Sequence, residues 1–312
     1  MNKTLNEHTV LNNADSVPYI TFKSLKDIKW LNCGFSTRYG GVSRGCFSSM
    51  NMSFMRGDDP EDVMENIRLF SSSAGFKPEN IVMPHQCHTT NVQTVGKYER
   101  GRGVRLKLLK NAGGKALSDI PGTEEETDGQ ITNQKDVVLY VLGADCVPVF
   151  IVDTEKRVIA AVHAGWKGTV NDIAGAAIEK MKSEFGTDPK DIKAVIGPSI
   201  CRDCYEVSGD VADVFIKRYY GSTDIVKDMD HNNIKIVRPA SGNFIDNPTG
   251  KYFLDLWEAN RVNLVKAGVS APEIEISGLC TKCHSDMFYS HRAHGNDRGV
   301  NIGFISITEP SL

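Results

Sequence analysis

Two histidines and a cysteine stand out as residues that could hold a metal ion. They lie in three separate segments, PHQCHTTNV around His88, LGADCVPVF around Cys146 and AVHAGWKGTV around His163. Imidazole nitrogen and thiolate sulfur suit zinc, and a site with three protein ligands leaves a fourth position for water or substrate. Because zinc lowers the pKa of such a water to about 7, this residue set favours a catalytic zinc site.

The spacing of these residues leaves other interpretations open. Positions 88, 146 and 163 match no local metal-binding motif, and a single cysteine or histidine is commonly an ordinary core residue. The chemical alternative is a nucleophilic pair, with Cys146 as the thiolate and His163 as its base. Metal analysis would distinguish these two interpretations.

Two further cysteine pairs could hold a second, structural metal. Cys201 and Cys204 lie in SICRDCYEV, and Cys280 and Cys283 lie in GLCTKCHSD, like two halves of a zinc ribbon. Their separation of roughly seventy-five residues far exceeds the usual spacing of about 15 to 20. This spacing favours paired buried thiols or thiols that oxidise, and it leaves a shared metal open.

Composition and charge restrict the class of protein. The chain has 312 residues, of which 40% are hydrophobic and 24% charged, and its formal net charge is -3. These values are typical of a soluble globular protein and give no basic surface for nucleic acid or an anionic membrane. Without an apolar signal sequence or a membrane-spanning run, the chain is expected in the cytoplasm with small-molecule partners and no obligate protein partner.

Apolar runs predict the elements that position the three residues. Residues 137–142, 147–152 and 158–163 are rich in β-branched side chains, which predicts strands buried on both faces. Cys146 lies between two of these strands, and His163 ends the third. Residues at adjacent strand ends commonly converge on one site, whereas His88 must arrive from a separate segment.

Other elements follow from capping signals and periodicity. A helix is expected after Asp59 and Pro60, an amphipathic helix over residues 169–185, and another over residues 252–268. Residues 193–197 and 300–307 are expected to form strands. We predict a loosely ordered tail over residues 1–18 and one mixed α/β domain over residues 19–312.

A charged insertion interrupts this domain near residues 97–127. Its first part is basic and its second part is acidic. Such charge runs usually form solvated surface segments, and the alternative interpretation is electrostatic steering of an anionic substrate.

The ordered motifs of the chain resemble those of the YfiH family, also called the laccase-domain or multicopper polyphenol oxidase-like family. They run from about Phe35 to the C-terminus and read GFSTRYGGVS, SSMNMSF, GDDP, QCH, TDGQIT, ADCVPV, HAGWKG, IGPSIC, CYEV, LDLW, CTKC and FYSHR. The resemblance implies an α+β fold with four αββα layers, in which helices flank two mixed sheets. It also implies similarity to the catalytic domain of cytotoxic necrotizing factor.

The same resemblance implies a metal and a reaction. The family's zinc ligands correspond to His88, Cys146 and His163. The implied activities are phosphorolysis of adenosine, inosine, guanosine and methylthioadenosine to base and ribose 1-phosphate, together with adenosine deamination. Alternatives are a copper-dependent polyphenol oxidase, a Cys/His hydrolase of amide bonds or peptidoglycan precursors, and a binding module that only uses the metal for stability.

Phosphorolysis requires a phosphate site beside the sugar. Arg38, in a glycine-rich turn, is the first candidate, and Arg292 is the second, because a guanidinium group pairs with phosphate oxygens bidentately. Each could equally form a structural ion pair. Ser49 and Asn51 could bind substrate hydroxyls, although small polar residues in such a region often stabilise turns.

Two residues close to the proposed ligands are also candidates. Asp145 could transfer a proton during deamination, but on a regular strand its side chain would project opposite to that of Cys146. Trp166 could stack on a purine, or it could simply pack at the strand end.

Three positions depart from the family pattern. Cys87 is an extra thiol beside His88, Thr89 replaces a glycine, and Ala293 replaces an arginine after Arg292. On a strand, Cys87 would face away from His88. None of these changes touches a proposed ligand, but they could shift substrate preference.

Overall fold

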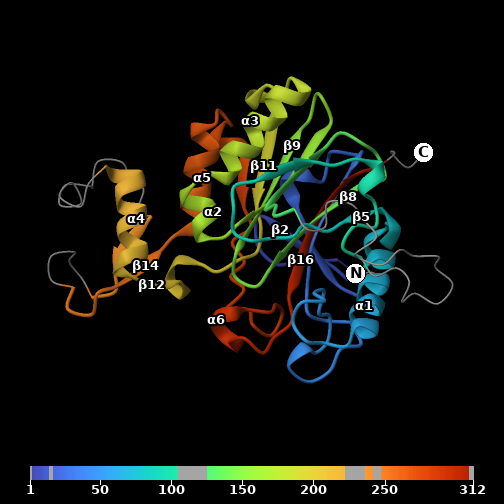
Figure 1. Ribbon diagram of the computed structural model, residues 1–312, viewed down its shortest axis with the longest axis horizontal. Coiled ribbons are helices and arrows are strands. Elements are labelled where there is room, and N and C mark those ends of the chain that lie inside the picture. The colour runs from blue at the N-terminus through green and yellow to red at the C-terminus, as the bar shows by residue number, and fades with distance from the viewer. Residues whose placement is uncertain (1, 14–16, 105–124, 222–235, 242–246, 309–312) are drawn as a thin grey trace.

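The computed structural model describes residues 2–13, 17–104, 125–221, 236–241 and 247–308. Most of the predicted charged insertion, residues 105–124, therefore lies outside the described part of the chain. Figure 1 shows strands gathered at the centre of the molecule, with helices on their outer sides. Among the described residues, no helix combines the length and apolar character needed to cross a membrane.

The strands form two large sheets and one small sheet. The seven-stranded sheet has the order β1 (Lys3–Thr4), β2 (Thr9–Asn12), β3 (Tyr19–Phe22), β4 (Leu31–Ser36), β16 (Asn301–Ile307), β8 (Val138–Gly143) and β5 (Ile81–Val82). The six-stranded sheet has the order β15 (Ile274–Ile276), β11 (Ile192–Ile196), β9 (Val147–Asp153), β10 (Val158–Ala164), β7 (Gly129–Thr132) and β6 (Val92–Thr94). The small sheet has the order β12 (Glu206–Ser208), β14 (Lys251–Leu254) and β13 (Val237–Pro239).

Both large sheets are mixed. The pairs β5 with β8, β6 with β7, and β11 with β15 are parallel, and the other pairs are antiparallel. The helices of the described residues are α1 (Pro60–Ala74), α2 (Trp166–Val170), α3 (Ile173–Phe185), α4 (Gly209–Tyr220), α5 (Leu256–Lys266) and α6 (His291–His294).

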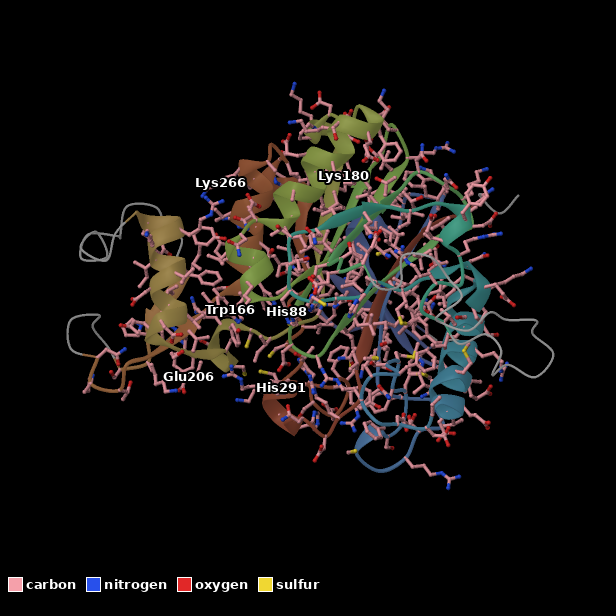
Figure 2. The ribbon with its side chains drawn as sticks, viewed as in Figure 1. His88, Trp166, Lys180, Glu206, Lys266 and His291 are labelled. Carbon is pink, nitrogen blue, oxygen red and sulfur yellow. The ribbon has the colours of Figure 1, made fainter. Side chains whose placement is uncertain are left out.

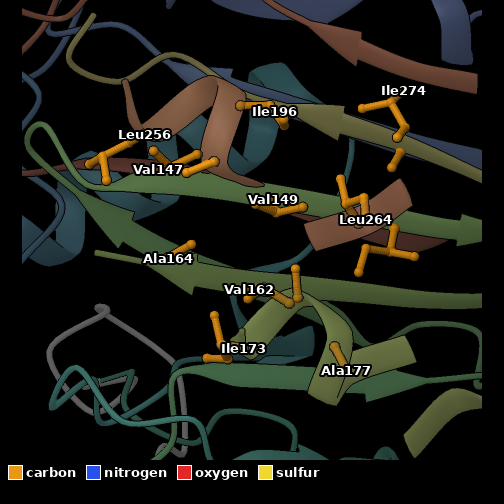
Figure 3. Close-up of a cluster of buried hydrophobic side chains, with 14 of the residues drawn as sticks. Val147, Val149, Val162, Ala164, Ile173, Ala177, Ile196, Leu256, Leu264 and Ile274 are labelled. Atoms are coloured by element: carbon orange, nitrogen blue, oxygen red, sulfur yellow. The ribbon is translucent and has the colours of Figure 1, made fainter. Parts of the chain in front are cut away.

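Alternating side chains on the central strands explain the layers. On β9, Val149 and Ile151 pack with the residues of α3 and α5, whereas Phe150 and Val152 face the seven-stranded sheet. Figure 3 shows the outer cluster, in which Val149 and its neighbours on the sheet lie against the helices. These strands are buried on both faces, as their continuous apolar sequences predicted.

The fourth layer is α1. Its residues Ile67 and Phe70 pack against Tyr140 of β8 and Phe304 of β16, on the outer face of the seven-stranded sheet. The prediction of an α+β fold with four αββα layers is therefore confirmed. Helix α1 also begins where predicted, because the Asp59 side chain accepts a hydrogen bond from the Glu61 backbone N–H.

Two predicted helices have bounds that differ from those expected. The segment 169–185 is divided between α2 and α3, because Asp172 adopts a positive φ of 64° and accepts from the Gly175 backbone N–H at the start of α3. In the segment 252–268, residues up to Leu254 pair as β14, and α5 begins only after its N-cap Asp255. Pairing with β12 and β13 overrides the apolar helical pattern there.

The prediction of a loosely ordered tail is wrong for residues 3–12. These residues form β1 and β2, and β2 pairs with β3 at the edge of the seven-stranded sheet. Asn6 turns the chain between them, since its side-chain oxygen accepts from the backbone N–H groups of His8 and Thr9. The polar composition of this segment does not predict strands, because pairing at a sheet edge depends on backbone hydrogen bonds rather than on apolar periodicity.

Candidate metal centre

The structure brings His88, Cys146 and His163 together. Their donor atoms all lie within 4.8 Å of one another. The Cys146 Sγ atom is 3.9 Å from His88 Nε2, and the two imidazole rings are 4.9 Å apart with an angle of 71° between them. Figure 2 labels His88 at this group, in the view below α2 and α5.

Each of the three residues comes from a different type of segment. His163 lies near the end of β10, Cys146 lies in the turn between β8 and β9, and His88 lies in the loop after β5. The antiparallel pairing of β9 and β10 places Pro148 opposite His163, which brings Cys146 to the same end of the sheet. The prediction that adjacent strand ends converge on one site is thus confirmed for Cys146 and His163.

His88 is held in a tight loop rather than on a strand. Its φ is 62°, in the left-handed region. The side chain of Gln86 fixes this loop, because its amide donates to the Leu142 carbonyl at 2.9 Å and accepts from the Leu142 N–H at 2.7 Å. The alternation argument for Cys87 therefore does not apply, and the Cys87 Sγ atom lies 3.6 Å from His85 Nε2, outside the three-residue group.

Asp128 organises the group, a role that the sequence alone did not indicate. One carboxylate oxygen lies 2.7 Å from His163 Nδ1 and also accepts from the His88 N–H at 3.0 Å. The other oxygen accepts from the N–H groups of Cys87 and Thr89 and from the Thr89 hydroxyl. The available signal was an acidic residue in the motif TDGQIT, directly before a strand.

The Asp128 contact determines which nitrogen of His163 can bind a metal. A proton on Nδ1 serves the hydrogen bond to the carboxylate, so Nε2 is left to point at His88 and Cys146. Asp128 and His163 are both almost fully buried. This arrangement of carboxylate, histidine and a vacant imidazole nitrogen is typical of zinc sites.

The ionisation of these groups is strongly coupled. Burial raises the pKa of Cys146, but the neighbouring charges and hydrogen bonds of His163 and His88 outweigh this and lower it to about 6. Burial lowers the pKa of His163, whereas Cys146 and Asp128 raise it to about 9. Without a metal, the site thus favours a thiolate beside an imidazolium.

The donor set and its surroundings fit zinc. A tetrahedral ion with bonds of about 2.3 Å to sulfur and about 2.0–2.1 Å to nitrogen requires a sulfur–nitrogen distance of about 3.6 Å, close to the 3.9 Å found. Space for this arrangement depends on Gly165, where an added Cβ would lie 2.8 Å from His88 Cδ2 and 3.3 Å from Cys146 Sγ. The glycine lets the chain turn from β10 into α2 without filling the site.

Asp145 lies next to Cys146 but is occupied by other contacts. It sits in the turn between β8 and β9 with a φ of 96°, so the expected regular strand is absent here. Its carboxylate accepts from the Thr281 hydroxyl at 2.6 Å and from the Arg292 backbone N–H at 2.7 Å. Asp145 therefore holds the loops around Cys146 in place.

Arg38 and Ser49 are engaged with the backbone. The Arg38 guanidinium donates twice to the Ser48 carbonyl and once to the Ser285 carbonyl. The Ser49 hydroxyl donates to the Arg38 carbonyl and accepts from the Gly41 N–H. These contacts stabilise the glycine-rich turn, which is the structural role considered for Ser49.

Asn51 is fully buried and binds only protein groups. Its amide nitrogen donates to the Asp58 carboxylate and the Ser53 carbonyl, and its oxygen accepts from the Val300 N–H. The structure leaves no amide atom of Asn51 free for a substrate hydroxyl, so the expected substrate contact is not supported.

Arg292 and Trp166 lie at exposed or half-buried positions. Arg292 donates to the Glu206 carbonyl, and its guanidinium lies 5.1 Å from the centre of the Tyr205 ring. Trp166 is half-buried at the first residue of α2, directly after Gly165, and packs at the edge of the outer core. Figure 2 labels Trp166 in the same region as His88.

Arg298 is a buried cation that the sequence analysis did not identify. It is 5% exposed, its Nε atom has no hydrogen-bond partner, and one terminal nitrogen donates to the Gly295 carbonyl. Burial and the charge of Arg56 lower its pKa, while the charges of Asp145 and Cys146 raise it. The Arg298 guanidinium therefore interacts electrostatically with Cys146, one of the three proposed metal ligands, and no motif in the sequence indicates this.

Several named proteins and solved structures are similar to this chain over most of its length. Residues 32–308 match the family model described as Multi-copper polyphenol oxidoreductase laccase. The chain is 34% identical to Purine nucleoside phosphorylase YlmD of Bacillus subtilis over 278 residues, which cover 88% of each chain. It is also 34% identical over 266 residues to Adenosine deaminase RL5 from an unknown prokaryotic organism, with 85% of this chain and 90% of that protein covered.

The fold agrees with this assignment. The crystal structure of YlmD from Geobacillus stearothermophilus is similar to the whole chain, with a TM-score of 0.77 and 30% sequence identity. The similarity covers 96% of this chain and 98% of that one. The ordered motifs, the fold and the relatives agree, and the chain belongs to the multi-copper polyphenol oxidoreductase laccase family.

Proposed function

We propose that this protein is a zinc-dependent enzyme that cleaves purine nucleosides with phosphate. The reaction gives a free base and ribose 1-phosphate from adenosine, inosine, guanosine or methylthioadenosine, and the same site deaminates adenosine. The observation that carries the proposal is the group of His88, Cys146 and His163, in which Asp128 directs the His163 ring. The names of the relatives, a purine nucleoside phosphorylase and an adenosine deaminase, support both reactions.

Three residues would hold the zinc ion, namely His88, Cys146 and His163. When bound, zinc supplies a Lewis acid that polarises a substrate oxygen and lowers the pKa of a water. Asp128 keeps the proton on His163 Nδ1, so that Nε2 stays available as a ligand. The N–H groups that donate to Asp128 from residues 87–89 hold His88 in position at the same time.

Phosphate requires a cation near these ligands, and Arg298 fits that requirement best. Its Nε atom is buried without a hydrogen-bond partner, and its guanidinium interacts electrostatically with Asp145 and Cys146. Arg38 and Arg292 remain further candidates, and each of them, like Arg298, also donates to at least one backbone carbonyl. We expect Arg298→Lys to raise KM for phosphate, because a lysine lacks the planar bidentate fork.

The proposal is tested by product analysis of the zinc-loaded protein. Adenosine or inosine is incubated with phosphate, and base, nucleoside and ribose 1-phosphate are separated by chromatography. We expect hypoxanthine and ribose 1-phosphate from inosine only when phosphate is present, and inosine plus ammonia from adenosine in its absence. Cys146→Ala should abolish both reactions, whereas Cys46→Ser, at an exposed cysteine outside the group, should not. Zinc-loaded protein that forms none of these products overturns the proposal.

The spatial arrangement of three side chains favours a second candidate function. Cys146, His163 and Asp128 are arranged as nucleophile, base and orienting carboxylate, which is the arrangement of cysteine hydrolases. Such an enzyme would cleave amide bonds, for example in peptidoglycan precursors, and its activity would survive complete removal of metal. Loss of turnover on chelation and recovery on adding zinc, but not copper, would support the zinc enzyme instead.

We place this activity in the cytoplasm. All eight cysteines of the chain are free thiols in the structure. Free thiols in this number fit a compartment that keeps cysteines reduced. Purine nucleosides and phosphate are the partners that this location and the proposed reaction require.

A further inference from the structure

Four cysteines outside the first metal centre converge at the end of two neighbouring strands. Strands β11 and β15 are parallel, so the segments that follow them leave the sheet at the same end of the strands. The pairing continues beyond the strands, where Ser199 bridges to Cys280 and donates from its N–H to the Leu279 carbonyl at 3.1 Å. Each of these two segments carries one C-x-x-C motif.

The sequence separation of the two motifs is therefore no obstacle to a shared site. Cys201 directly precedes a short 3-10 turn at Arg202–Cys204, and Cys280 and Cys283 lie in the turn after β15. The chain between the motifs forms α4, the small sheet, α5 and β15. Strand β15 then returns it to the end of the sheet where β11 ends. Strand pairing thus replaces the short linker of an ordinary zinc ribbon.

The four sulfur atoms lie close enough together to share one metal ion. All of them lie within 4.8 Å of one another, and Cys204 Sγ is 3.5 Å from Cys283 Sγ. A tetrahedral zinc ion with bonds of about 2.3 Å requires sulfur atoms about 3.8 Å apart. A disulfide requires about 2.05 Å, and all four cysteines are free thiols.

The backbone is arranged to receive thiolate charge. The N–H group of Cys201 points at Cys280 Sγ at 3.3 Å, and the N–H group of Cys283 points at the same sulfur at 3.4 Å. Hydrogen bonds from backbone N–H groups to sulfur stabilise the charged form of a cysteine ligand. The turns of the two motifs thus stabilise a metal-binding thiolate.

We propose that Cys201, Cys204, Cys280 and Cys283 form a second, structural site that binds Zn²⁺ through four thiolates. Four sulfur–zinc bonds form, and each of the four thiols releases its proton to solvent, so that no electron is transferred. With four protein ligands the site has no open position, which makes it structural rather than catalytic.

The location of this second site suggests what it stabilises. Thr281, within the second motif, donates from its hydroxyl to Asp145, and the N–H of Ile200, next to Cys201, donates to the Asp145 carbonyl. Asp145 directly precedes Cys146. The zinc ion would therefore clamp the two loops that hold the Cys146 turn, although the proposal does not depend on the reaction proposed above.

The test separates the two sites by removing the first one. In the double variant His88→Ala with Cys146→Ala, prepared with zinc under reducing conditions, elemental analysis should find about one zinc ion per chain, against about two in the wild type. Adding Cys201→Ser and Cys283→Ser should reduce this to about zero. Cys46→Ser is the matched control, and it should leave the zinc content unchanged because Cys46 belongs to neither group.

A second measurement covers the case in which the four-residue variant does not fold. The double variant is loaded with Co²⁺, and the thiolate-to-cobalt charge-transfer absorption should have the intensity of a tetrathiolate site. Titration of thiols in the denatured, chelator-treated double variant should then recover all seven remaining cysteines, these four included. The proposal is overturned if the double variant holds no zinc, if it holds iron in its place, or if these cysteines are recovered only after reduction.

Discussion

Asp128 joins two of the three ligand segments of the proposed metal centre, those of His88 and His163, through one carboxylate. It orients the His163 ring, and it accepts N–H groups from the loop that carries His88. His163 in turn donates from its backbone N–H to the Asp128 carbonyl at 2.7 Å. Asp128 is therefore a positioning residue, because it would act on a bound metal only through the two histidines.

Replacing Asp128 should weaken zinc binding more than folding. In Asp128→Asn the side-chain NH₂ group faces N–H donors, and the His163 ring loses its charged partner. We expect the zinc affinity of the first site to fall about 10–100-fold, measured by competition with a chromophoric chelator. Asp153→Asn is the control, since Asp153 is also buried and accepts two backbone N–H groups, but at the far end of β9. Equal losses in both variants would contradict the positioning role.

The same carboxylate predicts how acid acts on the metal-free protein. Burial raises the pKa of Asp128, but the hydrogen bonds from His163 and the 87–89 loop outweigh this and lower it from 3.8 to about 2. Because the folded-state pKa is the lower one, its contribution of about 2 kcal/mol is present above about pH 4 and disappears as the pH falls through about 2. Urea unfolding over this range should therefore be less pH-dependent in Asp128→Asn. Parallel curves for the two proteins would refute this assignment.

At the scale of elements, turns rather than strands present most of the ligands. Gln86 fixes the His88 loop to the end of β8, and Cys146 lies in the turn between β8 and β9, directly after Asp145. Strand β10 supplies His163 and then passes through Gly165 into α2. At Gly165 an added Cβ would lie 2.8 Å from the His88 ring and 3.3 Å from Cys146 Sγ.

Gly165→Ala should displace the first metal site without unfolding the protein. The new Cβ would lie 2.8 Å from a carbon of the His88 ring, so the ring must move away from Cys146. We expect zinc affinity to fall at least about tenfold, a loss of about 1.4 kcal/mol in binding. Calorimetric zinc titration measures this effect.

Gly186→Ala provides the matched control at the end of α3. Its φ of 68° strains an alanine, but no atom lies within 4 Å of the added Cβ. It should lower the free energy of unfolding by about 1 kcal/mol and leave zinc affinity unchanged. If Gly165→Ala behaves in the same way, the close approach has no role in metal binding.

At the scale of the whole molecule, two facing sheets carry the proposed metal centre. Phe150 of β9 is fully buried and points from the six-stranded sheet into the seven-stranded one. There it meets Gly303 of β16, where an added Cβ would lie 2.5 Å from the Phe150 ring. The inner faces interlock at this point, and the site lies at the end of the same strands.

Phe150→Ala should therefore destabilise the molecule rather than a single element. The cavity between the sheets should lower the free energy of unfolding by about 3–5 kcal/mol, measured by chemical denaturation. Val214→Ala, at a side chain of α4 that is 44% exposed, should change it by less than about 0.5 kcal/mol. A small effect of Phe150→Ala would show that the sheets do not depend on this contact.

Elements with a strong local signal could be predicted from the sequence. Elements that depend on pairing between distant segments could not. The apolar runs next to Cys146 and His163 were correctly predicted as buried strands, since continuous runs of β-branched residues favour strands buried on both faces. The N-terminal strands, the late start of α5 and the small sheet were missed, because their backbone pairing leaves little periodic pattern. Arg298 was missed because burial of a cation cannot be read from its neighbours.

The sequence by itself determined the donor chemistry, the α+β layers and the family, because these depend on residue types and on ordered local motifs. Tertiary structure alone decided that Asp128 directs His163 and that four cysteines, which follow two parallel strands, have sulfur atoms within 4.8 Å of one another. The physical reason is that both arrangements join segments far apart in the chain. Only the pairing and packing of strands fix the distances between such side chains.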